Sequence, residues 1–446
     1  MHFSICIPTR NRAAQLDALL CSLAPYVQTS RFSVALLVSD QSNDAVFDAN
    51  ARAIARFGGE CGITTFHWGG AGCRAESARR WLRLLSSGLK FSSELGYGAS
   101  RNHLLLASAG TRSVWLDDDV IFSPRSYPDP DRRLHSISKL GWRLWPKPSE
   151  STRRYAVGAQ AAPKDALDCM IDTLGVRDRR RVVVSMPGVY GDSGLGSHGV
   201  VPFERNVVPT AVHEDRAAFE HLISGQDCIR QSASFVVSSL HGFLATSFGL
   251  DNSQMVCPFA PTGRGEDQIW SVMQAKIDPG SGVAHLPWVI HHRGKGVDKR
   301  PFPDLASSTL WVALSVNAFD ATPDASAGDA MALLGDHLCR LAKIPMDDYL
   351  RELRECAFEF FEKETLRLRE ELNRCAALPW KVSHLSIGLL EWERAYSVLL
   401  LDKDRSRAGL DTFREARRRC MQLGLVLQRW HKLWILASTE SPFRVH

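Results

Sequence analysis

The stretch Ser113-Val114-Trp115-Leu116-Asp117-Asp118-Asp119 runs from an apolar segment into three consecutive carboxylates. Its first four residues have the composition of a short buried strand. The carboxylates that follow would repel one another unless a positive group lies between them. A divalent cation with phosphate oxygens is the usual such group, because hard cations take oxygen ligands. The stretch therefore predicts a strand that ends at a binding site.

Within the triplet, an extended chain would place Asp117 and Asp119 on the same side. One carboxylate would then hold a ribose hydroxyl while the other binds the metal. The alternative is a solvated acidic turn without a ligand, which is the ordinary role of a bare Asp-Asp-Asp. Its position directly after an apolar strand favours the binding site.

Strand and helix patterns alternate before the triplet, which is typical of βαβ units around a mostly parallel sheet. The expected strands are 3–7, 34–38, 63–68 and 113–116, and the expected helices are 14–23, 51–57 and 96–107. Three of these strands end in polar loops, and ligands of open α/β sheets bind at the carboxyl ends of strands. A shared ligand site at that edge is the consequence.

The pattern changes after the triplet. Residues 123–210 are rich in Pro, Arg, Gly and Ser, with a strand signal only at 182–184, and we treat them as an insertion or acceptor-side subdomain. Strand signals return at 233–238 and 284–290, and helical spacing begins near 305. The expected organisation is an α/β domain over 1–300 and an α-helical C-terminal region over 301–446.

The composition excludes several classes of protein. The 446 residues are 45% hydrophobic and 23% charged with a net charge of +5, which excludes general disorder and a small disulfide scaffold and gives no nucleic-acid footprint. The eleven scattered cysteines form no CxxC pair, and neither a secretion signal nor a spanning segment is evident. We expect a cytoplasmic protein, at most peripheral at the inner face of the membrane.

Five motifs carry a resemblance to a known family. They are Ser4-Ile5-Cys6-Ile7-Pro8-Thr9-Arg10-Asn11-Arg12, Val38-Ser39-Asp40-Gln41-Ser42, Gly98-Ala99-Ser100-Arg101-Asn102, Trp115-Leu116-Asp117-Asp118-Asp119 and Gly265-Glu266-Asp267. In this order, over roughly residues 1 to 295, they resemble the family 2 glycosyltransferases of the GT-A fold. The resemblance implies a nucleotide-diphosphate sugar as donor and Mn2+ or Mg2+ as cofactor.

The resemblance also implies roles for individual residues. Contacts to the nucleotide sugar would come from Pro8, Thr9, Arg10, Arg12, Asp40, Arg101, Asn102, Asp117, Asp118 and Arg293. Asp40 would receive the edge of the base, and Asp119 would bind the metal. For Asp40 a turn-forming role, bonded to its own backbone, is the open alternative. Arg101 taken alone would be an ordinary surface residue.

The pair Glu266-Asp267 is the expected acceptor side. In an inverting transfer one carboxylate removes the proton of the acceptor hydroxyl, and Asp267 is the candidate for that base. Glu266 would hold acceptor hydroxyls. The alternative is first-turn helix charge, which favours the helix dipole without any catalytic role. Both interpretations are compatible, because a helix start is a suitable place for a base.

Two histidines, His291 and His292, follow an apolar run. In related GT-A enzymes a late histidine completes the metal site, here beside Asp119 and Asp117, and Arg293 would contact the diphosphate. Adjacent residues of an extended segment face opposite ways, so one of the two histidines is the expected ligand. A buried histidine with a satisfied hydrogen bond is the alternative for either.

Two glycine-containing motifs do not predict a functional site. Gly191-Asp192-Ser193-Gly194 lacks the context of a trypsin-like nucleophile, and the glycines at 69–72 lack a phosphate-loop lysine. A basic, aromatic stripe near the C-terminus predicts a packing helix with a solvated charged face, or else a membrane-surface helix suited to a lipid-linked acceptor. The stripe comprises Arg414, Arg417, Arg418, Arg419, Arg429 and Lys432 with Trp430 and Trp434.

The sequence thus predicts a non-processive transferase, because the Gln-x-x-Arg-Trp signature of processive synthases is missing. Its acceptor, whether glycan, lipid-linked or peptide, and its oligomeric state are not indicated. A nucleotidyltransferase is the first alternative, for which Pro8-Thr9-Arg10-Asn11 is a poor match to the expected Gly-rich loop. A catalytically inactive nucleotide-sugar-binding scaffold is the second.

Overall fold

The computed structural model describes the chain in segments. They are residues 2–69, 97–126, 143–146, 160–161, 164–177, 180–191, 208, 214–223, 228–232, 234–239, 245–293, 308–320, 325–375, 377–383, 386, 389–390, 393 and 407–440. The glycines at 70–72, the Asp192-Ser193-Gly194 motif and much of 123–210 lie outside the described residues.

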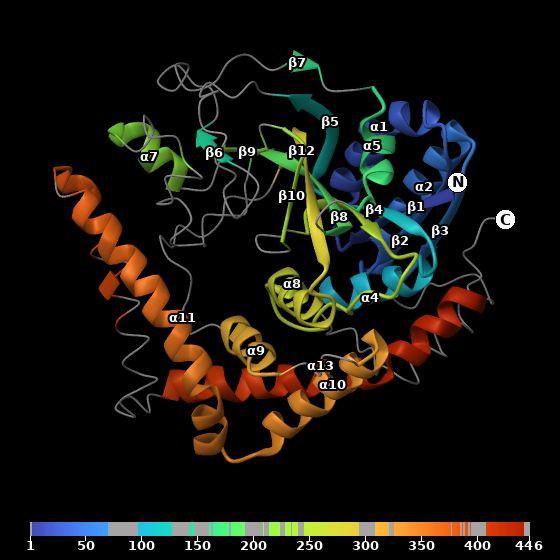
Figure 1. The fold of residues 1–446 in the computed structure, drawn as a ribbon. Coiled ribbons are helices and arrows are strands. Elements are labelled where there is room, and N and C mark those ends of the chain that lie inside the picture. The colour runs from blue at the N-terminus through green and yellow to red at the C-terminus, as the bar shows by residue number, and fades with distance from the viewer. Residues whose placement is uncertain are drawn as a thin grey trace.

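The first half of the central sheet is parallel (Figure 1). Its order is β3-β2-β1-β4, formed by β1 (His2–Thr9), β2 (Ser33–Asp40), β3 (Thr64–Trp68) and β4 (Arg112–Leu116). The helices of this half are α1 (Ala13–Gln28), α2 (Asp44–Cys61) and α4 (Tyr97–Ala107). α1 buries a leucine-rich face, because its apolar residues recur at helical spacing. The strands and helices expected before the triplet are confirmed.

The second half of the sheet is mixed, which corrects the expectation of a mostly parallel sheet. A parallel return needs a crossover of about a dozen residues, but only residues 117–119 separate β4 from β5 (Val120–Ser126), which pairs antiparallel with β12 (Ser281–His292). β11 (Ser247–Asp251) is antiparallel to β4 and to β8 (Arg181–Gly191), and β8 is parallel to β12.

Smaller elements complete this half. They are β6 (Arg143–Pro146), β7 (Gln160–Ala161), β9 (Cys228–Gln231), β10 (Val236–Ser238), α5 (Ala166–Asp172) and α7 (Arg216–Ile223). The central strand β11 was not expected, because it has five residues and contains Gly249. A Cβ at Gly249 would lie 2.2 Å from the Ser185 hydroxyl, so the close approach to β8 requires glycine.

The C-terminal helices are α9 (Ser308–Asn317), α10 (Ala327–Lys343), α11 (Met346–Arg374) and α13 (Arg407–Glu440). α9, α10 and α13 form a layer beneath α8 (Glu266–Ile277) and α4, whereas α11 runs up the side toward α7 (Figure 1). Trp115 and Trp270 of the sheet region belong to the same hydrophobic cluster as Trp311 and Trp430 of this layer. The predicted α/β class, with a flanked central sheet and a helical C-terminal region, is confirmed.

Membrane-spanning helices were searched for in the described segments. None of those helices combines the length and the apolar character that crossing a bilayer requires.

Candidate functional site

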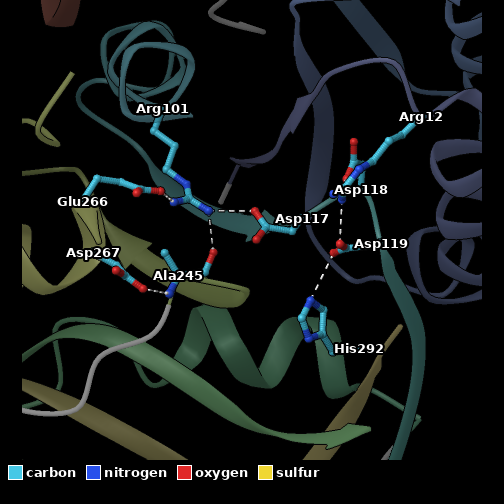
Figure 2. A network of polar contacts seen from close by, with 9 residues as sticks. All are labelled: Arg12, Arg101, Asp117, Asp118, Asp119, Ala245, Glu266, Asp267 and His292. Carbon is cyan, nitrogen blue, oxygen red and sulfur yellow. Dashed lines mark hydrogen bonds and ion pairs between the residues drawn. The ribbon is translucent and has the colours of Figure 1, made fainter. Parts of the chain in front are cut away.

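The acidic triplet lies at the carboxyl edge of the parallel strands, in a tight turn between β4 and β5. The backbone N–H of Val120 donates to the Asp117 carbonyl at 3.1 Å, so the triplet is not extended. This corrects the expectation that Asp117 and Asp119 point to the same side. Figure 2 shows Asp117 directed toward Arg101, whereas Asp119 is directed toward Arg12 and His292.

Asp118 ties the triplet to the first loop. Its side chain is buried and accepts hydrogen bonds from the Thr9 hydroxyl at 2.7 Å and from Arg12 Nη1 at 2.9 Å. Burial raises the pKa of Asp118, and the contacts with Thr9 and Arg12 oppose that rise. Pro8 is buried at the end of β1, whereas Arg10 is exposed beside it. The loop predicted to lie under the nucleotide therefore adjoins the triplet.

Asp119 has the most polar surroundings of the three. Arg12 Nη1 lies 2.6 Å from Oδ2, His292 Nε2 lies 3.2 Å from Oδ1, and the Arg293 N–H donates to the Asp119 carbonyl at 3.0 Å. Burial alone would raise the pKa of Asp119, but the contacts with His292 and Arg12 lower it to about 2. The other histidine, His291, packs its ring 5.1 Å from that of Tyr190. Of the two histidines, His292 is the one that meets the triplet.

Asp119 and His292 are suited to hold a divalent cation. Asp119 Oδ1 is buried and accepts no hydrogen bond of normal geometry from the described residues. Adjacent ligands of an octahedral ion at about 2.1 Å lie about 3 Å apart, close to the 3.2 Å between Oδ1 and His292 Nε2. No group of three or more His, Cys, Asp and Glu at metal-binding spacing occurs in the described segments. Phosphate oxygens would have to complete the coordination.

Arg101 connects the triplet to the acid pair (Figure 2). Its Nη2 donates to Asp117 Oδ1 and to the Ala245 carbonyl, both at 2.8 Å, and its Nη1 donates to Glu266 Oε1. The guanidinium is buried, so three acceptors replace its water shell. Burial favours loss of its proton, but Asp117, Glu266 and Asp267 outweigh burial and raise the pKa of Arg101. Arg101 is therefore an internal bridge rather than a surface residue.

The acid pair begins α8, as the sequence indicated. Asp267 Oδ1 accepts from the N–H of Gln268 at 2.9 Å, and Oδ2 accepts from the N–H of Ala245 at 3.3 Å. Glu266 is buried, and burial raises its pKa although Arg101 opposes the rise. Asp267 is only partly buried. Of the two, Asp267 has the carboxylate that solvent reaches more easily.

Two residues expected near the nucleotide have internal roles. Asp40 is fully buried and accepts from the Ser42 N–H at 2.8 Å, from Asn50 Nδ2 at 2.7 Å and from His67 Nε2 at 3.0 Å. This is the turn-forming alternative. Asn102 is also fully buried and exchanges two hydrogen bonds with the backbone of Phe259, at 2.9 and 2.7 Å.

Sequence reasoning missed His67, which stacks on Phe47 with 4.1 Å between ring centroids. Its only signal is a polar residue near the carboxyl end of an apolar run. Among the cationic side chains, Arg12 was expected near the nucleotide, and the structure places its guanidinium directly on two triplet carboxylates.

Comparisons with known proteins find distant likenesses among solved structures. TarS residues 1–349 from S. aureus, solved alone and with UDP, is 13% and 12% identical over 91% of this chain and 93% of that one, with a TM-score of 0.37. The mannosyltransferase PcManGT from Pyrobaculum calidifontis, in complex with GDP-Man and Mn2+, is 11% identical over 97% of this chain and 87% of that one, with a TM-score of 0.26. No family model and no curated protein matches. At these TM-scores the likenesses carry no conclusion about this chain.

Proposed function

We propose that this chain is a metal-dependent glycosyltransferase of GT-A type, similar to family 2, which moves a sugar from a nucleotide-diphosphate donor to an acceptor hydroxyl with inversion. The observation that carries the proposal is the Arg101 bridge, because it brings Asp117 of the triplet and Glu266 of the acid pair onto one guanidinium. Residues 1–300 would carry the site, with 123–210 on the acceptor side and 301–446 as the helical region behind it.

The triplet side is proposed to bind the donor. Asp119 and His292 would hold Mn2+ or Mg2+, which neutralises the charge that develops on the departing diphosphate. Asp117 would contact the ribose or the sugar. Arg10 of the first loop and Arg293, which follows β12, would contact the diphosphate. Arg12 neutralises Asp118 and Asp119 from the same side.

The acid pair is proposed to serve the acceptor. As the hydroxyl oxygen bonds to the anomeric carbon, Asp267 takes the hydroxyl proton, and the bond from that carbon to the diphosphate oxygen breaks on the opposite face. Glu266 is held by Arg101, so its contribution is to orient the site rather than to accept the proton. Asp267 suits a base because its carboxylate accepts hydrogen bonds from the backbone N–H groups of Ala245 and Gln268 and stays partly exposed.

The test is a panel of nucleotide sugars with Mn2+ or Mg2+, scoring donor hydrolysis and thermal stabilisation. Asp267→Asn should keep nucleotide binding within about twofold while turnover falls by about 10² to 10⁴, the range for loss of a general base. Asp348→Asn, an exposed carboxylate of α11, is the matched control and should keep full turnover.

Three outcomes would contradict the proposal. Full turnover by the Asp267→Asn variant would show that Asp267 is not the general base. Transfer of a nucleotidyl group from a nucleoside triphosphate to an acceptor, with release of pyrophosphate and without a sugar nucleotide as donor, would indicate a nucleotidyltransferase. Metal-dependent binding of a sugar nucleotide without turnover under any condition would indicate an inactive scaffold.

A further inference from the structure

The C-terminal helix α13 lies along the irregular segment 252–265, which joins β11 to the acid pair. Trp434 Nε1 donates to Asn252 Oδ1 at 3.1 Å, and Trp430 Nε1 donates to the Val256 carbonyl at 2.7 Å. Further along, the Thr262 hydroxyl donates to Gln422 Oε1 at 2.7 Å. In these three contacts, higher-numbered residues of the segment meet lower-numbered residues of α13. The two therefore run in opposite directions, with one face of the helix following the whole segment.

This arrangement accounts for the basic, aromatic stripe of the sequence. Trp430 is buried, and Arg417 donates to the carbonyl of Ala342 at the end of α10. Arg414 and Arg418 are exposed and pair with acids of their own helix. The stripe is thus on a packing helix with a solvated charged face, whose tryptophans donate to the segment that follows β11.

Arg419 stands apart from the exposed arginines of α13, because it is only 2% exposed. Its Nη1 donates to the hydroxyls of Ser308 and Thr309, both at 3.0 Å, and its Nη2 donates to the Arg264 carbonyl at 3.2 Å. The Thr309 hydroxyl in turn donates to the same carbonyl at 2.6 Å. Two donors from the helical region therefore fix one peptide group, two residues before Glu266.

The turn held in this way consists of Gly263, Arg264 and Gly265. Both glycines have left-handed backbones, with φ of +83° and +75°. A Cβ at Gly263 would lie 2.4 Å from Arg419 Cζ, and a Cβ at Gly265 would lie 2.4 Å from Thr309 Cγ2. The turn is therefore pressed directly onto the guanidinium and the threonine. Glycine adopts this backbone readily but also leaves it readily, so an external contact is needed to hold it.

We infer that Arg419 is a positioning residue, which fixes the Gly263–Gly265 turn and through it the direction in which Glu266 and Asp267 enter the site. The kinetic part of this inference rests on the proposed function, whereas the structural part does not. A displacement of about 1 Å in a reacting group costs about 100-fold in rate. The C-terminal helices would then be a structural component of the active site rather than a separate module.

The test compares Arg419→Gln and Arg419→Lys with Arg418→Gln in the full chain. Arg418 lies one residue away on the exposed face, so its variant is the matched control. Hydrogen exchange of the amides of residues 263–270 is the first readout, with the Ile269 N–H, which donates to the Gly265 carbonyl, as the reporter. Turnover and nucleotide affinity with the active sugar nucleotide are the second.

Arg419→Gln should speed exchange in 263–270 by about tenfold or more, equal to about 1.4 kcal/mol of opening free energy, while exchange in β1 and β4 stays unchanged. It should lower kcat by about 10- to 100-fold and leave the nucleotide Kd within about twofold. Arg419→Lys should recover part of kcat, because an ammonium still reaches the carbonyl but loses the planar fork. Arg418→Gln should match the wild type in both readouts.

Wild-type exchange and kcat in Arg419→Gln would overturn the inference. If Arg419→Gln fails to fold, Arg419→Lys decides, because it keeps a cation at this position and loses the fork that joins the Arg264 carbonyl to the Ser308 and Thr309 hydroxyls. Accelerated exchange at 263–270 in Arg419→Lys supports the inference, and exchange equal to that of the wild type overturns it. A wild-type protein that turns over no sugar nucleotide would defeat the proposed function, while the exchange readout would still decide the role of Arg419.

Discussion

An aspartate lies beside a histidine at the carboxyl end of β2 and again just after β4, yet the two aspartates differ in burial and in how many of their hydrogen bonds are made. Asp40 at the end of β2 accepts hydrogen bonds on both oxygens and is 0% exposed. Asp119 after β4 has one buried oxygen without a hydrogen bond of normal geometry and faces Arg12 and His292. A carboxylate whose two oxygens both accept hydrogen bonds from the chain stabilises the fold, whereas one with a free acceptor position is available to a ligand.

The largest expected difference follows from Asp119→Asn. Removing the charge takes away the main oxygen ligand of the proposed cation, so Mn2+-dependent nucleotide affinity should fall by at least about 100-fold. The free energy of unfolding without metal should also fall, by about 2 kcal/mol, because Arg12 and His292 stabilise the charged form of Asp119. Calorimetric titration of UDP and GDP with and without Mn2+ measures the first effect. Unchanged metal-dependent affinity would refute the role assigned to Asp119.

Asp40→Asn should lower the stability of the protein and leave metal-dependent binding intact. The amide nitrogen would face donors, so the free energy of unfolding should fall by about 2 kcal/mol. Urea denaturation at pH 7 measures this fall. The apparent affinity of the folded protein for Mn2+ should stay within about twofold of the wild type. A stable Asp40→Asn protein that binds no nucleotide would instead restore Asp40 to the base-binding role.

The stability loss in Asp40→Asn should also depend on pH. Burial alone would raise the pKa of Asp40, but hydrogen bonds from His67, Ser42 and Asn50 hold it below its usual value. A carboxyl with a lowered folded pKa adds stability above its unfolded pKa of about 3.9 and loses it as the pH falls through the folded value. The gap between wild type and variant should therefore be full at pH 7 and narrow below about pH 4.

The two histidines should give the same contrast with smaller effects. His292→Gln should weaken Mn2+-dependent nucleotide binding by about tenfold, the size of a lost ligand contact. His67→Gln should lower the free energy of unfolding by about 1 kcal/mol and leave the Mn2+ concentration for half-maximal binding unchanged. If both variants changed the metal dependence equally, the number of hydrogen bonds made by each aspartate would not distinguish a metal site from a structural one.

Local signals were enough to predict the strands that deliver the acids. β1, β2 and β4 are apolar runs that end at polar residues, and the α8 start combines glycines with first-turn acids. Each of these features depends on residues that lie within a few positions of one another in the sequence. The order of the motifs along the chain then indicated which strand ends to expect at a shared site.

The partners of those acids could not be predicted, because they come from distant parts of the chain. Arg101 meets Glu266 across 165 positions, and Arg419 meets the Arg264 carbonyl across 155. Nothing near Asp40 in sequence shows that His67 will complete its hydrogen bonds. The antiparallel insertion of β11 between β4 and β8 is likewise a long-range pairing. Whether a carboxylate finds hydrogen-bond donors for both of its oxygens depends on these long-range contacts.

The central claim is that the triplet and the acid pair form one site for a metal, a nucleotide sugar and an acceptor. Anomalous diffraction from crystals grown with Mn2+ and UDP or GDP tests it most directly. We expect a manganese peak in contact with Asp119 and His292, with the diphosphate beside it and Asp267 facing the position of the sugar. A peak away from the triplet, or a nucleotide on a surface that Asp267 does not face, would show that the triplet and the acid pair do not form one site.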